Sequence, residues 1–497
     1  MTETLLSEDS VGKRTLPIVL IRVFVKGGII SPGDLLGVLK VAQALDLDYI
    51  HLGSRQDILF PIEKSKVDLL PVLLAALPLP YEYQESEQQN IISSYITRDI
   101  ISSTRWLAPH IYHYVLDSFD YLPTHKINII DPLQGMVPLF TGNINFIASP
   151  IDNYWYLYFR YTDIQAKPWC CPELIYGFDL AKVAQAVEKL NPLANQLSFS
   201  QLYEQLKQQV HFNTRPIEQP LAYPDTMFPY YEGINLMEGG KYWMGLYWRN
   251  NRFTIKFLQA LCEQCLATNI GNIGLTPWKS IVVKGITEGD RLAWEKLLGK
   301  YGINMRHSSL ELNWHIPVAD DEALELKNYL VRVLDQRDIS TYGLTFSVKT
   351  QAHQILFSSV AIERVVASNE QAPTQYNILY AKDFNPNLFE FIYYARSVSK
   401  EVIPSLLIEL SKKYYEQLHA KTVPSEKSVQ LSLSSVAEDR QVYQCTQCLG
   451  VYDSQIGNPS AEINPGVTFE DLPEDYTCHV CSAPKASFAK ITLSELL

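Results

Sequence analysis

The alternation of apolar and polar residues predicts a strand–helix–strand–strand unit near the start of the chain. Residues 16–25 are rich in Leu, Ile and Val, which favours a strand. Ser31-Pro32-Gly33-Asp34 is typical of a helix start, with serine as the cap, proline at the first position and aspartate closing a capping box. An apolar stripe at helical spacing follows, formed by Leu35, Leu36, Leu39, Ala42 and Leu45. Residues 49–52 and 58–62 then predict two strands joined by a turn at Gly53-Ser54.

The same unit recurs later in the chain. Residues 245–286 repeat the order strand, turn, helix, strand, strand. The apolar stripe of the second helix consists of Phe257, Leu258, Leu261, Cys262 and Cys265. Residues 52–58 lie opposite residues 275–281 in this alignment, so Gln56 corresponds to Lys279. A repeat with so long a period indicates two homologous halves and not a solenoid of short units.

Composition indicates a globular protein of several domains. With 497 residues, 47% of them hydrophobic and 19% charged, the chain is long enough to bury more than one core. Its net charge of −12 argues against a nucleic-acid-binding surface. The acidic N-terminus does not resemble a secretory signal, and the most apolar run, residues 69–79, contains two prolines, so we expect no membrane span. The eight cysteines suggest no disulfide framework, which fits a reducing cytoplasm.

Two Cys-x-x-Cys pairs near the C-terminus are candidates for a metal site. Cys445 and Cys448 form the first pair, and Cys478 and Cys481 form the second. Each pair offers two sulfurs from one tight turn, and two such turns build a tetrahedral four-thiolate site. Zinc ribbons share this spacing with iron proteins, so the cysteines alone leave the metal open.

The sequence around these cysteines resembles rubredoxin over its whole length. The matching residues are Tyr443, Val451-Tyr452-Asp453, Pro465-Gly466, Phe469-Glu470-Asp471-Leu472-Pro473, Asp475-Tyr476, Ala483-Pro484-Lys485 and Phe488. The resemblance implies one iron, held by the four cysteines, that cycles between ferric and ferrous and moves one electron. It also implies an apolar shield around the iron, made of Tyr443, Tyr452, Phe469, Tyr476 and Phe488.

Some positions depart from the rubredoxin pattern. Leu449 and Ser482 stand where rubredoxins usually have glycine after each pair. His479 replaces a proline, and Tyr476 replaces a common tryptophan. These changes bear on the reduction potential more than on the metal. A structural zinc site is the alternative.

The two repeated units resemble the ferredoxin-like half-domains of nitrite and sulfite reductases, which occur twice per chain. Weaker similarity to that family's sirohaem-binding domain extends over Leu122-Pro123, His125, Lys126, Asn143-Ile144-Asn145-Phe146 and residues 178–190. The resemblance implies an α+β fold in which a duplicated reductase-like body precedes a small rubredoxin-like domain. It also implies that Arg55, with Lys279 in the second repeat, faces a sirohaem; an exposed strand charge is the alternative.

The body departs from those reductases at the positions of their chemistry. Their [4Fe–4S] cluster needs four cysteines, but no cysteine lies between Cys265 and Cys445, and residues 307–312 and 348–353 occupy the expected places. The family's anion-contacting basic residues fall near Phe24, His125 and Ile127. Without cations there, reduction of nitrite or sulfite loses its electrostatic support. We therefore expect no [4Fe–4S] cluster, no sirohaem and no catalytic residues in the body.

These matches set the expected domain boundaries. They are 14–213 for the first reductase-like half, with its repeat at 20–80; 214–241 for a connector; 242–420 for the second half, with its repeat at 242–300; 421–440 for a flexible tether; and 441–491 for the rubredoxin-like domain. The tether has no helical stripe and no aromatic residue. The other cysteines are expected to be structural, with a second metal site as the alternative: Cys170, Cys171, Cys262 and Cys265.

Together these features predict a cytoplasmic one-electron carrier whose body docks a redox partner. The partner would be a nitrite or sulfite reductase or an NAD(P)H-dependent reductant, and we expect no nucleic-acid or membrane partner. Acidic residues outnumber basic ones in the rubredoxin-like domain, which favours steering toward a basic surface. One alternative is a sirohaem-binding reductase of nitrite/sulfite type fed by its own rubredoxin domain. Another is a non-redox assembly protein with structural zinc.

Overall fold

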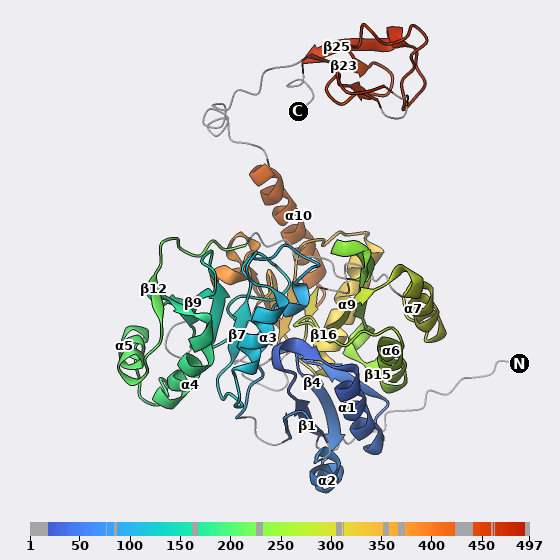
Figure 1. The fold of residues 1–497 in the computed structure, drawn as a ribbon. Helices are drawn as coiled ribbons and strands as arrows, with labels where there is room; N and C mark the ends of the chain where they lie inside the picture. Colours follow the sequence, from blue (N-terminus) through green and yellow to red (C-terminus); the bar gives the residue numbers. More distant parts are fainter. Residues whose placement is uncertain are drawn as a thin grey trace, which may run out of the picture. The chain divides into compact units, whose positions relative to one another are not determined.

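The chain forms two compact units (Figure 1). They are Met1–Gln417, here termed the body, and Leu418–Leu497, here termed the C-terminal unit. The computed structural model describes residues 18–75, 77–83, 87–161, 167–224, 232–304, 311, 313–350, 357–365, 373–422, 441–458, 461 and 463–492. Within these ranges no helix is both long and apolar enough to cross a membrane.

The body begins with the predicted strand–helix–strand–strand unit. Its elements are β1 (Ile18–Val23), β2 (Ile29–Ile30), α1 (Pro32–Ala44), β3 (Tyr49–Leu52) and β4 (Ile58–Glu63), followed by α2 (Leu70–Leu74) and β5 (Tyr81–Glu82). Ser31 caps α1, because its Oγ accepts a hydrogen bond from the Asp34 N–H at 3.0 Å and donates one to the Asp34 carboxylate at 2.7 Å. The helix start predicted from the sequence is therefore confirmed.

The predicted second copy of this unit is also present. Its elements are β14 (Tyr242–Tyr247), β15 (Phe253–Thr254), α6 (Ile255–Ala267), β16 (Ile273–Leu275) and β17 (Ser280–Ile286), followed by α7 (Glu288–Lys300). Residues with left-handed backbone recur at the same places: Gly27, Asp46 and Gln56 in the first copy and Asn250, Asn269 and Lys279 in the second. The two copies therefore correspond residue by residue.

The two copies exchange short edge strands. β2 pairs with β16 of the second copy, where Ile30 lies opposite Ile273. In return, β15 pairs with β3 of the first copy, where Phe253 lies opposite Ile50. The resulting sheets run β15-β3-β4-β1-β5 and β13-β14-β17-β16-β2, with β13 at Gly233–Leu236. Each copy thus completes the sheet of the other.

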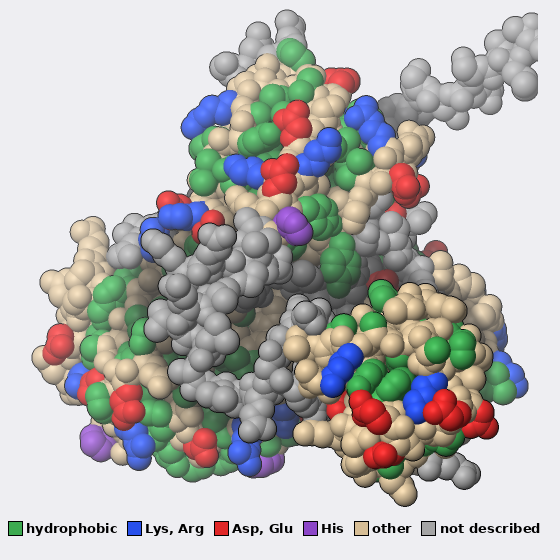
Figure 2. Space-filling model, turned by 90° about the horizontal axis from the view of Figure 1, so that it is seen from above, with side chains coloured by type: hydrophobic (Ala, Val, Ile, Leu, Met, Phe, Trp, Pro, Cys, Tyr) green, Lys and Arg blue, Asp and Glu red, His purple; other side chains and the backbone are tan. Residues whose placement is uncertain are grey.

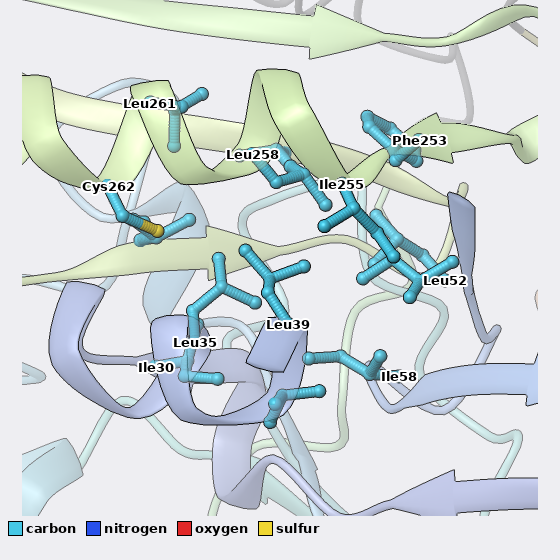
Figure 3. Close-up of a cluster of buried hydrophobic side chains, with 14 of the residues drawn as sticks. Ile30, Leu35, Leu39, Leu52, Ile58, Phe253, Ile255, Leu258, Leu261 and Cys262 are labelled. Carbon is cyan, nitrogen blue, oxygen red and sulfur yellow. The ribbon is translucent and has the colours of Figure 1, made fainter. Parts of the chain in front are cut away.

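One hydrophobic core joins the two copies. Helices α1 and α6 lie side by side, and Leu35 and Leu39 point toward Leu258 and Cys262 (Figure 3). Cys265 is buried in the same core, and burial raises the pKa of both thiols to about 12. These thiols are protonated at neutral pH, as expected of structural cysteines.

Two further sheets complete the body and share a topology. The first runs β12-β11-β9-β8-β7-β6 with β10 beside β9, and the second runs β18-β19-β20-β21-β22. Each has two parallel pairings at one end and antiparallel pairings after them. The strands are β6 (Ile92–Ser93), β7 (Ile127–Ile130), β8 (Ile144–Ala148), β9 (Tyr154–Phe159), β10 (Trp169–Cys170), β11 (Glu173–Tyr176), β12 (Thr214–Pro216), β18 (Trp314–His315), β19 (Phe346–Lys349), β20 (Val360–Arg364), β21 (Tyr376–Ala381) and β22 (Phe391–Val398). The helices are α3 (Pro109–Asp117), α4 (Leu180–Leu190), α5 (Phe199–Gln209), α9 (Asp321–Gln336) and α10 (Ile403–Thr422).

The expected connector and tether differ in how much of them the structure describes. Both ends of the 214–241 connector enter sheets, since β12 pairs with β11 and β13 pairs with β14. Residues 225–231 in its middle lie outside the described residues. Helix α10 includes the first two residues of the expected 421–440 tether, and residues 423–440 lie outside the described part of the chain.

The C-terminal unit is built on a small sheet. Its strands are β23 (Gln441–Cys445), β24 (Val451–Tyr452) and β25 (Phe488–Thr492), in the order β24-β23-β25. Strand β23 ends at Cys445, which lies opposite Phe488 at the start of β25. The sheet therefore brings one cysteine and one ring of the expected shield together.

Candidate functional site

The two Cys-x-x-Cys segments fold into matching turns. In the first, the Leu449 N–H donates to the Cys445 carbonyl at 2.9 Å, and the Cys445 N–H donates to the Gly450 carbonyl at 2.8 Å. In the second, Ser482 and Cys478 repeat these bonds, both at 2.8 Å. Leu449 and Ser482 have φ of 63° and 59°, the left-handed conformation that glycine adopts without strain.

These turns bring four sulfurs together. The ligand atoms of Cys445, Cys448, Cys478 and Cys481 all lie within 4.8 Å of one another. The Cys445 and Cys481 sulfurs are 3.7 Å apart, and those of Cys448 and Cys478 are 3.4 Å apart. A tetrahedral site with metal–sulfur bonds of about 2.3 Å has sulfurs roughly 3.8 Å apart. The sulfurs therefore fit a single tetrahedral metal ion.

Backbone N–H groups point at the sulfurs. Cys445 and Cys478 each receive two such hydrogen bonds, and Cys448 and Cys481 receive one each; the donors are Gln447, Cys448, Gly450, Val480, Cys481 and Ala483. The Gln447 N–H is the main cause that lowers the pKa of Cys445 to about 7. The Gly450 N–H favours the Cys448 thiolate, but the neighbouring sulfurs raise the pKa of Cys448 to about 12. Ionisation of all four thiols therefore needs a bound cation.

The five rings expected to shield the metal form one cluster. Tyr443 stacks on Phe469 with ring centres 4.0 Å apart, and Tyr452 and Tyr476 are buried beside them. Phe488 packs against this cluster and also against the cysteines. The structure thus brings all five residues together and places Phe488 between the sulfurs and the other four.

The opposite side of the centre is open. Leu449 and Val480 are 65% and 61% exposed, and Cys481 is exposed. Gly450 packs tightly here, since a Cβ there would lie 3.3 Å from the Cys448 sulfur and 3.3 Å from Val480 Cγ2, and these neighbours would have to shift slightly. On this side the exposed Leu449 and Val480 side chains therefore form the apolar cover between the sulfurs and solvent.

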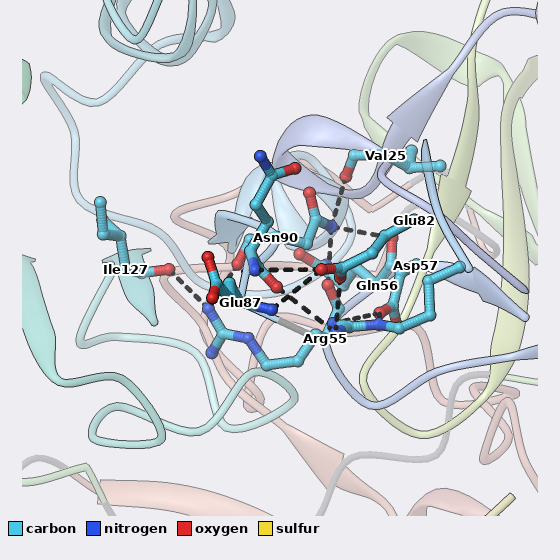
Figure 4. Close-up of polar contacts among 10 residues, drawn as sticks. Val25, Arg55, Gln56, Asp57, Glu82, Glu87, Asn90 and Ile127 are labelled. Atoms are coloured by element: carbon cyan, nitrogen blue, oxygen red, sulfur yellow. Dashed lines mark hydrogen bonds and ion pairs between the residues drawn. The ribbon is translucent and has the colours of Figure 1, made fainter. Parts of the chain in front are cut away.

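In the body, Arg55 occupies the turn between β3 and β4. Its guanidinium donates to Asn128 Oδ1 at 2.8 Å and to the carbonyls of Asn90 and Ile127 at 2.7 and 2.8 Å (Figure 4). Its Nε is buried without a hydrogen-bond partner. Burial lowers the pKa of Arg55 to about 9, so the side chain is still a cation at neutral pH.

Lys279 occupies the equivalent turn between β16 and β17. Its Nζ donates to the carbonyl of Ile316, and burial lowers its pKa to about 7. Arg55 and Lys279, expected to face a sirohaem, line one cavity of about 350 Å³. In this structure the Arg55 Nη atoms and the Lys279 Nζ donate to acceptors of the protein itself.

Three further residues line this cavity: Arg22 and His315, which the sequence did not point to, and Lys126, which was named only within the weaker similarity to the sirohaem-binding domain. Arg22 pairs with Asp57 at 3.1 Å and with Glu82 at 3.8 Å. Burial, reinforced by nearby cations, lowers the pKa of Lys126 to about 8. Burial also lowers the pKa of His315. We refer to the cavity lined by Arg22, Arg55, Lys126 and Lys279 as the cationic cavity.

The positions expected to hold anion-contacting residues carry other side chains. Phe24 and Ile127 are buried, and the His125 imidazole lies 3.7 Å from the Glu188 carboxylate. Arg22 precedes Phe24 by two residues, a spacing that puts side chains on the same face of extended backbone. The alternation of side chains between the two faces of a strand could therefore have identified Arg22 from the sequence.

The segments expected to replace the cluster cysteines are only partly described. Within 307–312 the structure describes Glu311 alone, and within 348–353 it describes residues 348–350. In the described ranges the four C-terminal cysteines are the one group of three or more metal-ligating side chains that converge.

Comparison with known families agrees with both resemblances. Residues 442–488 match the rubredoxin family, and residues 16–76 match the nitrite/sulfite reductase ferredoxin-like half domain. The body and its sheets also resemble the NirA protein of Mycobacterium tuberculosis, with a TM-score of 0.62 over 80% of each chain. Sequence identity to NirA is 14%, so this similarity concerns the fold alone.

Curated relatives match the C-terminal unit. The chain is 41% identical over 81 residues to the high molecular weight rubredoxin of Moorella thermoacetica, of which it covers 35%, about a third of that protein's length. It is 36% identical over 63 residues to rubredoxin-1 of Chlorobaculum tepidum, of which it covers 91%. It is 44% identical over 50 residues to rubredoxin 4 of a Rhodococcus species, of which it covers 83%. Through its C-terminal domain, which follows a nitrite/sulfite reductase-like body, this chain belongs to the rubredoxin family.

Proposed function

We propose that this protein is a one-electron carrier in which a single iron, held by the four cysteines, serves a partner reductase. The observation that carries the proposal is the convergence of four sulfurs within 4.8 Å of one another on two matching turns. An iron in such a site alternates between ferric and ferrous and exchanges one electron.

The protein's own residues prepare this site in three ways. Backbone N–H groups from both turns stabilise the thiolates. Phe488 and the rings behind it exclude water on one side of the sulfurs. On the other side Leu449 and Val480 form a thin apolar cover, which lets a partner approach closely. We therefore place electron exchange with the partner on the side covered by Leu449 and Val480.

Charge on the C-terminal unit suits a basic partner. Glu470, Asp471, Glu474 and Asp475 are all exposed in one short segment. Asp453 of the same unit is instead buried, and it accepts a hydrogen bond from the Gln455 N–H at 3.0 Å. On the face drawn in Figure 2, acidic and basic side chains lie interspersed without a large patch of one sign. The 470–475 segment is therefore the best candidate for electrostatic steering.

We propose that the body does no redox chemistry and provides docking. The sequence has no cysteine between Cys265 and Cys445, so the body lacks thiolates at the positions where those reductases hold their [4Fe–4S] cluster. In addition, the Arg55 Nη atoms and the Lys279 Nζ donate to the protein's own acceptors. A nitrite or sulfite reductase, or an NAD(P)H-dependent reductant, would be the docked partner.

Metal analysis and visible spectra test the iron directly. We expect the purified chain to contain one iron and to show thiolate-to-iron absorption that bleaches with dithionite. Stoichiometric zinc in a colourless protein would instead support the structural, non-redox alternative.

A second candidate function is a sirohaem-dependent reductase fed by its own rubredoxin domain. The converging cations of the cationic cavity favour it, since sirohaem is rich in carboxylates. The Cys445→Ser variant separates the two candidates by removing a ligand of the iron. A Soret band in that variant would support the second function, and no Soret band in either protein would remove it.

A further inference from the structure

A second cavity of the body has no lining residue in common with the cationic cavity. Its volume is about 320 Å³, and its walls come from the segment 95–99, from β16 and β17, and from the loops beside these strands. This volume lies at the low end of the roughly 300–1,000 Å³ range of ligand pockets, which suits a small molecule. Its titratable side chains are Tyr95, Asp99, Lys241 and Lys284. We refer to it as the Lys284 cavity.

The lysine at the centre of this cavity is not required by the ferredoxin-like repeat. Lys284 of β17 lies opposite Trp243 of β14, and in the first copy Pro61 of β4 lies opposite Leu20 of β1. The alignment of the two copies matches these positions. The same strand therefore forms with a proline in one copy and a lysine in the other, so the fold alone does not explain the amine.

Backbone carbonyls and one aromatic ring hold the Lys284 amine. Its Nζ donates to the Arg98 carbonyl at 3.0 Å and to the Tyr95 carbonyl at 3.4 Å, and it lies 4.7 Å from the centre of the Tyr95 ring. In its uncharged form the amine has two N–H groups for these carbonyls and a free lone pair, which is what attack on an electrophile requires. The contacts therefore suit a nucleophilic amine.

The surroundings of Lys284 favour the uncharged form. Burial lowers its pKa to about 8, while the Asp99 carboxylate raises the pKa and the Arg98 guanidinium lowers it. About half of the Lys284 side chains are then uncharged at about pH 8, against roughly 0.4% for a lysine in solution with a pKa of about 10.4. A lysine of this kind can form an imine with a carbonyl compound.

Asp99 places a carboxylate in the same cavity. It lies 3.5 Å from Arg98 Nε, and its side chain is 32% exposed, so it can exchange protons with water. Imine formation needs such a group, because protons must leave the attacking nitrogen and reach the departing oxygen. The cavity thus combines an amine, a proton carrier and room for a small reactant.

We propose that Lys284 captures a small aldehyde as an imine in the Lys284 cavity, with Asp99 as the proton carrier. The nitrogen attacks the aldehyde carbon and a C–N bond forms. Asp99 transfers the two protons of the amine, one after the other, to the carbonyl oxygen, which leaves as water while the C=N bond forms. This condensation changes no oxidation state, so it needs no oxidant or reductant.

Reductive labelling of the full chain with propionaldehyde and sodium cyanoborohydride at about pH 8 tests the proposal, because the hydride converts imines into stable amines. Peptide mass spectrometry then gives the labelling rate at each lysine. We expect Lys284 to be labelled about tenfold faster than Lys241, or more, and its rate to level off as the aldehyde concentration rises. Lys241 is the matched control because it lines the same cavity but is exposed, and its rate should rise linearly.

The Asp99→Asn variant tests the role of the carboxylate. Because Asp99 raises the pKa of Lys284, its loss alone would leave more uncharged amine and speed labelling. Loss of a proton carrier should instead slow the labelling of Lys284 by about tenfold or more. Lys284→Arg keeps the charge and should remove the saturable labelling. Thermal unfolding confirms that each variant is folded.

Two results would overturn the proposal. One is labelling of wild-type Lys284 that is no faster than that of Lys241 or that does not saturate, which needs no variant to interpret. The other is unchanged or faster labelling in Asp99→Asn, which would mean that Asp99 carries no protons in this reaction. Neither measurement involves the iron, so this proposal and the proposed function can fail separately.

Discussion

Leu449 has φ of 63° at a position where a side chain is strained. Since it is 65% exposed, its side chain loses little packing when removed. Leu449→Gly should therefore stabilise the C-terminal unit by roughly 0.5–1 kcal/mol, after the entropy of glycine in the unfolded chain offsets part of the relief. Denaturant titration followed by the iron absorption measures this. Leu449→Ala is the control, because it keeps the Cβ and the strain; an equal gain from alanine would contradict the argument.

Lys279 should make stability depend on pH. Folding lowers its pKa from 10.5 to about 7, so below pH 7 the ammonium is charged in both states and the full cost of burial is present. As pH rises from 7 toward 10.5, the unfolded chain still holds a proton that the folded chain has released, and the cost falls. In chloride buffer, Lys279→Met should be more stable than the wild type by roughly 2 kcal/mol or more at about pH 6, a difference that shrinks toward pH 10.

Urea titrations of both proteins across this range check the prediction. The comparison with the variant removes the contribution of other titrating groups. A stability difference that does not change with pH would mean that Lys279 titrates normally in the folded protein.

The sequence predicted the metal ligands better than the cavity, for a physical reason. The cysteines are recognisable because two sulfurs from one turn need two residues between their cysteines, a spacing that is visible in the local sequence. The cationic cavity instead collects single residues from distant segments, such as Arg22 and Lys126, and their convergence is visible only in the fold. The special role of Phe488 among the five rings likewise follows from strand pairing with Cys445 and not from its own neighbours in sequence.

At the scale of elements, α1 and α6 hold the two ferredoxin-like copies together. Leu39 of α1 is fully buried in their common core, and Leu36 on the same helix is only partly buried. Leu39→Ala should lower the free energy of unfolding by about 2–5 kcal/mol, and Leu36→Ala by clearly less. Because one core serves both copies, they should unfold in a single transition. Tryptophan fluorescence in urea measures both quantities, and separate transitions for the two copies would contradict the shared core.

Helical and strand periodicity predicted the repeat, but not how its copies associate. The helix and the longer strands were found because apolar spacing marks them over many residues. The exchanged strands β2 and β15 have two residues each, too few to carry a pattern. Their pairing depends on the packing of α1 against α6, which the sequence does not specify locally. The shared core therefore became evident only in three dimensions.

At the scale of the whole molecule, the chain joins a rubredoxin domain to a reductase-like body. We propose that electrons enter and leave through the C-terminal unit alone, while the body contributes docking. This division of roles has a simple consequence for redox stoichiometry. A chain with one iron and no other centre accepts one electron, whereas a body with its own cofactor accepts more.

An anaerobic reductive titration of the full chain measures this number most directly. The account predicts that one electron per iron completes the reduction, and that the visible bands bleach in a single step with no later spectral change. Uptake of further electrons, or a second spectral transition in the body, would contradict it.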